Sequence, residues 1–384
     1  MTQILLERVT NTTRRVLATN YEADEDVLMT EAGYLAASVT LFFIGFFGFF
    51  LNLCVIVLMW KDKQLWTPLN IILFNLVCSD FSVSILGNPW TLSSALSQRW
   101  IFGKTMCKMY GFFMAILGIS SITSLAVLAY ERYTIVSKPF RNHGLTRKGA
   151  LYLVAGIWLY SLLLTVPPFL GWGKYVNEAA NISCSVNWEE QSMNAMTYIL
   201  YLFAFGLVVP MGVIVFSYLH IIFTMRKNQI RMGQTTKAEG RVTYMIFLMI
   251  VAFLLAWSPY AVFALLAQFG NPSLISPAAG VIPALLAKSS ICYNPIIYVA
   301  LNSQFRQVLK QVIGIRDREV VSNCETYAVG VSRIASTAKS NETGNRMQME
   351  QVREQNFQFN SARNGCQIET IVIDEEHEED MSRL

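Results

Sequence analysis

The chain of 384 residues is long enough for two or three soluble domains, but its composition argues against a soluble protein. Apolar residues make up 53% of the sequence, charged residues only 15%, and the mean hydropathy is +0.39, whereas a soluble domain carries about 25% charge. The apolar content excludes a disordered chain, the net charge of +4 excludes a nucleic-acid binder, and seven cysteines are too few for a disulfide scaffold. The composition predicts a membrane protein.

Long stretches without charged side chains predict the membrane spans, because a bilayer helix needs about 20 mostly apolar residues. The first five are residues 32–60, 69–98 (with the single acid Asp80), 109–130, 149–173 and 191–225. The charge-free stretch 242–287 is too long for one span, and the turn at residues 269–273 divides it into a sixth helix and a seventh that ends near Leu301. The expected fold is an all-α bundle of seven transmembrane helices over residues 32–301.

Basic residues in the short loops set the orientation of the bundle, since cytoplasmic loops carry the excess of Lys and Arg. With the N-terminus outside, the inner loops carry Lys61, Lys63, Arg132, Lys138, Arg141, Arg147, Lys148, Arg226, Lys227, Arg231, Lys237 and Arg241. The outer loops then carry Arg99, Lys104, Lys108 and Lys174. This bias predicts a multi-pass membrane protein with its N-terminus outside and its C-terminus in the cytoplasm. The expected location is the plasma membrane, which makes the N-terminus extracellular.

The two ends of the chain differ from the bundle in composition. Residues 1–31 are polar, lack the apolar core of a cleavable signal peptide, and carry a glycosylation sequon at Asn11. Residues 302–317 have the spacing of an amphipathic helix that lies on the inner lipid surface. Residues 318–384 turn polar, end in an acidic run, and are expected to form a disordered cytoplasmic tail.

Lys288 is the one charged residue between Arg241 and Arg306, and it falls near the middle of the seventh span. A charge at the bilayer centre costs about 2.5–3.5 kcal/mol, and Lys288 is too far from either end of the span to snorkel. A structural lysine paired with an acid is one interpretation. A functional role is the stronger one, because a buried amine tends to be neutral and then attacks carbonyls, as in a Schiff base with an aldehyde. A protonated imine would need a carboxylate nearby.

Two acids are candidates for that carboxylate. Asp80 lies within the second span, where a hydrated polar network with Asn52 and Asn294 is preferred to a counter-ion role. Glu178 lies in the second outer loop, six residues before Cys184. Of the seven cysteines, only Cys107 and Cys184 are placed in an oxidising compartment. A disulfide between them would draw Glu178 toward the interior, although a solvated loop acid is the simpler interpretation of Glu178 taken alone.

In order and spacing, these residues resemble a class A G-protein-coupled receptor, and specifically an opsin, over about residues 32–313. The matching positions are Asn52, Leu76 to Asp80, Cys107, Glu131-Arg132-Tyr133, Trp158, Pro210, Tyr218, Trp257-Ser258-Pro259-Tyr260 and Asn294-Pro295-Ile296-Ile297-Tyr298. The opsin assignment rests on Lys288, six residues before Asn294, where opsins carry their retinal-binding lysine. Segments 234–239 and 302–306 resemble ciliary opsins, most of all the encephalopsin group or the invertebrate ciliary opsins.

The resemblance implies a mechanism. Retinal, bound as the 11-cis isomer through a protonated Schiff base to Lys288, isomerises to all-trans on absorbing light. Vertebrate visual pigments have a counter-ion glutamate three residues after the helix-three cysteine, but this chain has Tyr110 there, which carries no charge near neutral pH. In many other opsins the counter-ion is a glutamate six residues before the loop cysteine, which matches Glu178. Glu178 is therefore the expected counter-ion, and without an acid at Tyr110 the pigment is expected to be bistable.

The same resemblance implies the surroundings of the ligand. Trp257 is expected to pack against the polyene, although core aromatic packing alone would also explain a tryptophan at that depth. Tyr260, Tyr110 and Gly118 are expected to line the pocket.

Activation and coupling are also implied by the resemblance. The expected switch residues are Glu131, Arg132, Tyr133, Glu239, Asn294, Pro295 and Tyr298. Arg132 would pair with Glu131 and Glu239, and breaking these pairs would open a cleft for a heterotrimeric G protein of the Gi/Go/transducin type. Serines and threonines in the tail are candidates for a receptor kinase and for arrestin binding. Cys324 is a candidate for palmitoylation, with a free thiol as the alternative.

Two other functions share part of this pattern. A retinal photoisomerase would have the same lysine and fold but weaker coupling motifs, whereas these motifs are intact here, so an enzyme is not expected. A non-photosensory receptor for a diffusible ligand would leave Lys288 without an explanation.

Overall fold

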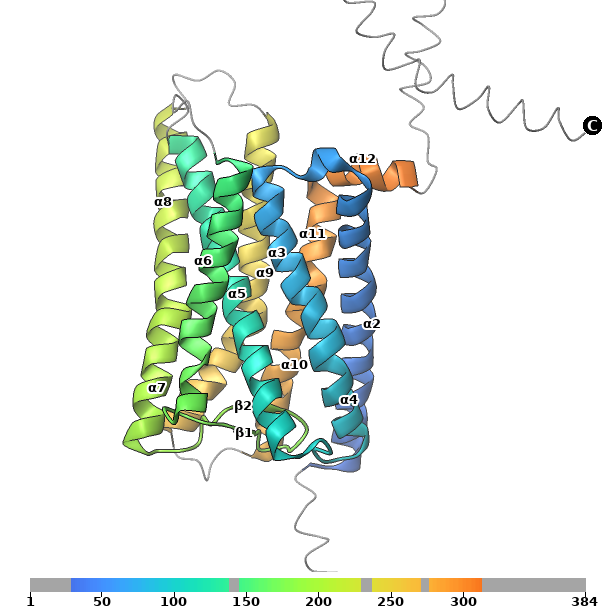
Figure 1. The fold of residues 1–384 in the computed structure, drawn as a ribbon, viewed down its shortest axis with the longest axis vertical. Helices are drawn as coiled ribbons and strands as arrows, with labels where there is room; N and C mark the ends of the chain where they lie inside the picture. The colour runs from blue at the N-terminus through green and yellow to red at the C-terminus, as the bar shows by residue number, and fades with distance from the viewer. Residues whose placement is uncertain (1–28, 138–144, 229–236, 271–275, 313–384) are drawn as a thin grey trace, which may run out of the picture. The chain divides into compact units, whose positions relative to one another are not determined.

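The computed structural model describes residues 29–137, 145–228, 237–270 and 276–312. In this part of the chain, seven helices are long and apolar enough to cross a membrane, which confirms the predicted seven-transmembrane bundle (Figure 1). The spans in chain order are α2 (Glu31–Lys61), α3 with α4 (Pro68–Ser82 and Asn88–Leu96), α5 (Gly103–Ser137), α6 (Arg147–Thr165), α7 with α8 (Met193–Phe203 and Val209–Asn228), α9 (Lys237–Phe269), and α10 with α11 (Val281–Ser289 and Tyr293–Leu301).

Local sequence explains where several of these helices begin and end. The hydroxyl groups of Thr30, Thr67, Thr146 and Ser192 accept hydrogen bonds from backbone N–H groups in the first turns of α2, α3, α6 and α7. The fourth helix ends at Thr165, earlier than the residue 173 expected from the apolar stretch. Pro167 and Pro168 follow, and because proline has no N–H group the α-helical hydrogen bonding stops there. The chain continues as a short 3-10 helix, Pro167–Leu170.

Three spans contain an irregular turn, and each of these turns lies just before a proline. Proline lacks an N–H group and its ring clashes with the carbonyl four residues earlier, so the helix changes its winding there. The turns are Val83–Gly87 before Pro89, Ala204–Val208 before Pro210, and Ser290–Cys292 before Pro295. The last of them begins two residues after Lys288.

The pattern of burial is that of a bundle in lipid. Large apolar side chains of α2, such as Phe42, Phe43 and Phe50, remain about half exposed on the outside of the bundle. Polar side chains such as Asn52 and Asp80 are buried among the helices. Because lipid offers no hydrogen bonds, polar groups are placed inside, where other helices can satisfy them.

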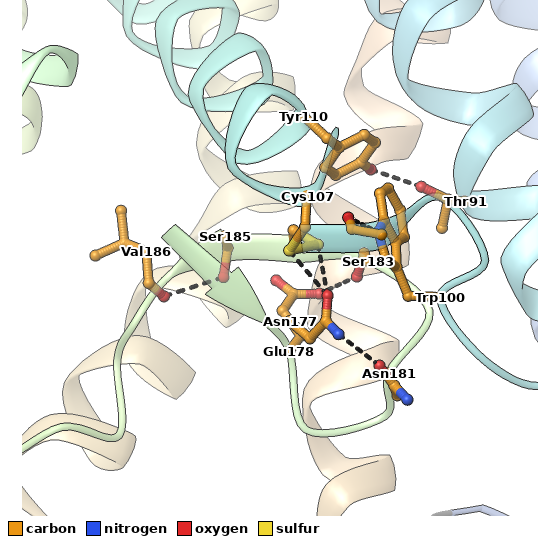
Figure 2. The surroundings of a disulfide bond; sticks show 12 residues. Thr91, Trp100, Cys107, Tyr110, Asn177, Glu178, Asn181, Ser183, Ser185 and Val186 are labelled. Atoms are coloured by element: carbon orange, nitrogen blue, oxygen red, sulfur yellow. Dashed lines mark hydrogen bonds between the residues drawn. A yellow bond between two sulfur atoms is a disulfide. The ribbon is translucent and has the colours of Figure 1, made fainter. Parts of the chain in front are cut away.

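A two-stranded hairpin covers one end of the bundle, here called the hairpin end (Figure 1). Strand β1 (Tyr175–Asn177) pairs antiparallel with β2 (Cys184–Val186), with Asn177 opposite Cys184. The predicted disulfide between Cys107 of α5 and Cys184 is present (Figure 2). Tyr175 packs where a Cβ at Gly111 of α5 would come within 2.8 Å of its ring, so the hairpin lies directly against α5.

At the opposite end, α12 (Ser303–Val312) follows α11 after the extended residue Asn302. Phe305 and Val308 of α12 are buried, and the Phe305 ring stacks on Tyr298 with a centroid distance of 6.3 Å. Several predictions fall outside the described residues: Asn11, Cys324, the tail 318–384 and most of the segment 1–31. The side chain of Glu239 is also not described, although its backbone lies in α9.

Candidate functional site

A cavity of about 430 Å³ lies inside the bundle, next to the hairpin, and residues of both line it. All six residues expected at the ligand pocket line it: Lys288, Glu178, Tyr110, Gly118, Trp257 and Tyr260. They come from α10, the hairpin, α5 and α9, so the cavity lies where three spans and the loop meet. Its volume is within the range of about 300–1,000 Å³ typical of small-molecule sites.

Glu178 is held by its neighbours in the hairpin. Its backbone N–H donates to the carbonyl of Ser183 at 2.9 Å, which extends the pairing of β1 and β2 by one step. The Ser183 hydroxyl also donates to one carboxylate oxygen of Glu178. Figure 2 shows Glu178 and Ser183 beside the disulfide. The cross-link and these bonds give a loop acid a defined position at the cavity.

The second carboxylate oxygen of Glu178 accepts a hydrogen bond from Tyr260 of α9 at 2.9 Å. The Tyr260 hydroxyl in turn accepts a bond from the indole N–H of Trp188 at 3.1 Å. Trp188 lies in the loop after β2 and also lines the cavity. Both oxygens of the Glu178 carboxylate therefore accept a hydrogen bond from a neighbouring hydroxyl group.

Tyr110 occupies the α5 position where an acid was considered from the sequence. It is 2% exposed, and its hydroxyl lies 2.6 Å from the Thr91 hydroxyl of α4 (Figure 2). Lys288 interacts electrostatically with Tyr110 and with Glu178. In the described part of the chain, Glu178 and Lys288 do not form a direct ion pair, so the carboxylate acts on the amine across the cavity.

Trp257 of α9 is part of the cavity wall. Its indole N–H donates to Ser290 of the seventh span at 3.1 Å. A Cβ at Gly118 of α5 would lie 3.0 Å from the Trp257 ring, so glycine allows the ring to approach α5. The Tyr260 ring stands edge-on to Trp257 at a centroid distance of 6.2 Å. These contacts fix one orientation of the indole at the cavity.

Asp80 lines the same cavity, and its carboxylate accepts a hydrogen bond from Asn294 at 2.9 Å. The structure joins only two of the three residues expected in one network by direct hydrogen bonds. The Asn52 amide instead donates to the backbone carbonyls of Gly48 and Ile291, at 2.8 and 2.9 Å. It thus ties α2 to the irregular turn of the seventh span.

The expected switch residues lie toward the α12 end. Arg132 is buried in α5 and interacts electrostatically with Glu131 and Tyr218. The Tyr133 ring packs against Phe216 and His220 of α8. Pro295 and Tyr298 are buried in α11. The pairing of Arg132 with Glu239 falls on a side chain outside the described part of the structure.

The sequence interpretation missed four residues that hold the candidate site together. They are the hydrogen-bond partners of the expected pocket residues: Ser183, Thr91, Ser290 and Trp188. A tryptophan in a loop close to a cysteine expected in a disulfide was a usable signal for Trp188. The other three are hydroxyl residues of a kind common throughout the chain, and their positions carry no distinguishing pattern.

Comparison with known proteins identifies the family. A family described as the 7 transmembrane receptor (rhodopsin family) matches residues 51–298. Pinopsin of Columba livia is 35% identical over 313 residues, covering 81% of this chain and 87% of that protein. Parapinopsin of Ictalurus punctatus is 37% identical over 285 residues, covering 73% and 82%. The crystal structure of squid rhodopsin matches with a TM-score of 0.70 and 31% identity, covering 74% of this chain and 87% of that chain.

These matches extend over most of the bundle and include both the cavity and the hairpin that covers it. The relatives are opsins, and the family is one of receptors. The chain therefore belongs to the opsins, within the rhodopsin family of seven-transmembrane receptors, and is a receptor rather than an enzyme.

Proposed function

We propose that the chain is a light-sensing receptor of the ciliary type that holds retinal on Lys288 and activates a heterotrimeric G protein. The observation that carries this proposal is a cavity of about 430 Å³ that contains one amine, Lys288, and a carboxylate, Glu178, held in place by the hairpin. Lys288 would hold retinal as a protonated Schiff base, and the bound retinal would supply an 11-cis to all-trans isomerisation on absorbing light.

The residues of the chain fit such a ligand. The cavity is lined mainly by apolar and aromatic side chains, among them Met114, Phe203 and Trp257, which suits a polyene. Lys288 supplies the amine that bonds to an aldehyde. Trp257, held by Ser290 and close to Gly118, offers a flat wall whose position depends on α5, α9 and the seventh span.

Glu178 offsets the positive charge on the Lys288 nitrogen. An opposite charge nearby stabilises a protonated nitrogen, and two hydroxyl donors hold the Glu178 carboxylate at the cavity. A second cavity of about 40 Å³ is lined by Glu178, Ser183 and Lys288, and its volume suits a bridging water. Tyr110 hydrogen-bonds Thr91 and supplies no negative charge, so we expect the light-adapted form to keep its imine and to be reset by a second photon.

Coupling would occur at the end of the bundle that carries Arg132 and α12. α9 and the seventh span would hold the ligand and would have to accommodate its change of shape, and a bundle with two packings can turn such a change into an opening. Arg132 with Glu131 and Glu239, and Asn294 with Tyr298, are the residues for this switch. We place this end in the cytoplasm, where a G protein of the Gi/Go/transducin type, a receptor kinase and arrestin are the expected partners.

The decisive experiment is to express the chain with 11-cis retinal, purify it, and record absorption spectra before and after illumination. A visible band that shifts with light is expected. Lys288→Ala should abolish the band completely, because Lys288 is the one lysine among the described residues that line the cavity. A wild-type protein that stays colourless, or a Lys288→Ala protein that colours equally well, would overturn the proposal.

Light-dependent nucleotide exchange on a purified G protein then tests the receptor role against that of a chemoreceptor. We expect exchange to rise only after illumination of the retinal-bound protein. Exchange that responds to added small molecules in darkness and ignores light would favour the diffusible-ligand alternative.

A further inference from the structure

Trp188 lies in the loop after β2, contacts Tyr260 of α9, and lines the cavity of about 430 Å³. Its ring lies edge-on to Tyr260 at a centroid distance of 6.2 Å and edge-on to Phe203 of α7 at 6.1 Å. Its indole N–H is shared between two oxygens, the Ser185 hydroxyl and the Tyr260 hydroxyl, each at 3.1 Å. Trp188 is therefore bound from both sides, by the hairpin and by α9.

The direction of these hydrogen bonds follows from the donor inventory. An indole N–H can only donate, so the Tyr260 oxygen must accept from Trp188. The single proton of Tyr260 is then left for the Glu178 carboxylate, which can only accept while it is ionised. The chain runs in one direction, from Trp188 through Tyr260 to Glu178, and each donation polarises the next group and strengthens its bond.

The loop that carries Trp188 is itself anchored. Glu190 accepts hydrogen bonds from Ser192 at 2.8 Å and from the Asn187 amide at 3.0 Å, and it forms an ion pair with Lys174 at 3.2 Å. The Ser192 hydroxyl and the Lys174 ammonium hold the pKa of Glu190 below its usual range. The Gln268 amide of α9 donates to the Glu190 carbonyl at 3.3 Å, so the same stretch of loop is tied to α9 a second time.

From this geometry we infer that Trp188 is a positioning residue for the counter-ion: its indole N–H directs the Tyr260 hydroxyl onto the Glu178 carboxylate. This inference rests on the proposed function, in which Glu178 faces the nitrogen of Lys288. Trp188 acts through Tyr260, at a distance of two hydrogen bonds from the carboxylate, and need not touch the linkage itself.

The predicted readout is the protonation of Glu178. Acidification neutralises this carboxylate, so the positive charge spreads from the imine nitrogen into the polyene and the visible band moves to longer wavelength. The titratable groups that line the two cavities together with Glu178 are Lys288 on α10, Tyr260 on α9, Tyr110 on α5, Glu189 on the loop and Asp80 on α3. The Glu178→Gln variant, which lacks the titrating group, identifies the part of the titration that belongs to Glu178.

The main test is Trp188→Phe in the full-length pigment reconstituted with 11-cis retinal. Phenylalanine keeps an aromatic ring and removes the donor. The hydrogen bond from Tyr260 to Glu178 favours the charged carboxylate. Loss of the Trp188 donor should weaken this bond and move the midpoint of the acid transition to higher pH by about half a unit. An unchanged midpoint would overturn the inference.

A double-variant cycle separates positioning from simple packing. If Trp188 acts through Tyr260, adding Trp188→Phe to a Tyr260→Phe protein should give no further shift of the midpoint. A further shift as large as that in the wild-type background would show that Trp188 acts by another route and would overturn the inference.

Trp188→Leu keeps the test available if Trp188→Phe does not fold. Leucine also lacks the N–H donor, so the midpoint should again move to higher pH. An unchanged midpoint in a folded Trp188→Leu protein would overturn the inference. The thermal unfolding midpoint of the retinal-free protein checks each variant for loosening of the loop.

Trp172→Phe is the matched control. Trp172 is another loop tryptophan whose indole N–H donates, to Thr197 at 3.0 Å, but it lines neither cavity. The midpoint of the acid transition in Trp172→Phe should equal that of the wild type. A shift as large as that of Trp188→Phe would overturn the inference. A wild-type protein without colour would defeat the proposed function, whereas a coloured wild type with an unshifted Trp188→Phe would defeat only the role of Trp188.

Discussion

Two carboxylates line the same cavity, and they are held there in different ways. Asp80 belongs to a transmembrane helix, is 4% exposed, and accepts a hydrogen bond from Asn294 of another span. Glu178 belongs to a loop and reaches the cavity because a disulfide, a strand pairing and two side-chain donors hold it. Asp80 is therefore positioned by its helix, whereas Glu178 is positioned by tertiary contacts.

This difference shows that a receptor can bring a charged side chain to its internal cavity from a loop, without carrying that residue on a membrane-spanning helix. An ionised group on a span must be paired within the bundle at some cost. The position of the loop acid Glu178 depends instead on the cross-link and on the contacts of the hairpin with α5. We therefore expect changes in the hairpin to affect the charge on the Lys288 nitrogen far more than changes around Asp80.

The largest effect should come from breaking the cross-link. Replacing Cys107 and Cys184 together by alanine frees the hairpin, and loss of a disulfide typically costs about 2–5 kcal/mol. The thermal half-life of the pigment at 37 °C should fall by at least about tenfold. The measurement is the decay of the visible band, and Cys78→Ala, which removes a free thiol of α3, serves as the control. A double variant as long-lived as the wild type would show that the hairpin keeps its position without the bond.

Glu178→Gln should have the next largest effect. The amide keeps the shape of the side chain but cannot offset the positive charge, so the pH at which the visible band is lost should fall by about 1–3 units. At neutral pH the absorption should move toward the near ultraviolet. Spectra recorded across a pH series provide the measurement. If the spectrum stays unchanged, the counter-ion is another group, and Asp80 is the first candidate because it lines the same cavity.

Asp80→Asn should have the smallest effect of the three. The new amide oxygen can still accept the hydrogen bond from Asn294, so the free energy of unfolding should change by less than about 1 kcal/mol. The visible band should keep its position at neutral pH. Absorption spectra and thermal unfolding of the two proteins side by side measure both quantities. A shift toward the near ultraviolet in Asp80→Asn would reverse the assignment of the two acids.

Much of the fold was predictable because the signals are local. The length of each apolar stretch gave the number of spans, and TM helices need no distant partner to be recognised. The α-helix of the fourth span ends eight residues before the end of the charge-free stretch, because apolar residues continue past Pro167 and Pro168, whereas the α-helix gives way there to a 3-10 helix. The absence of a hydrogen bond between Asn52 and Asp80 was equally unpredictable, because both backbone and side-chain acceptors were open to Asn52.

The amino-acid sequence by itself determined the bundle, the isolated lysine in the seventh span and the two cysteines able to form a disulfide, because composition, charge and compartment act on each segment separately. Only the tertiary structure decided which groups surround that lysine. The bond from Tyr260 to Glu178 spans 82 residues and the bond from Trp188 to Tyr260 spans 72. No spacing in the sequence encodes such contacts, since they exist only after the helices have packed and the hairpin has closed over them.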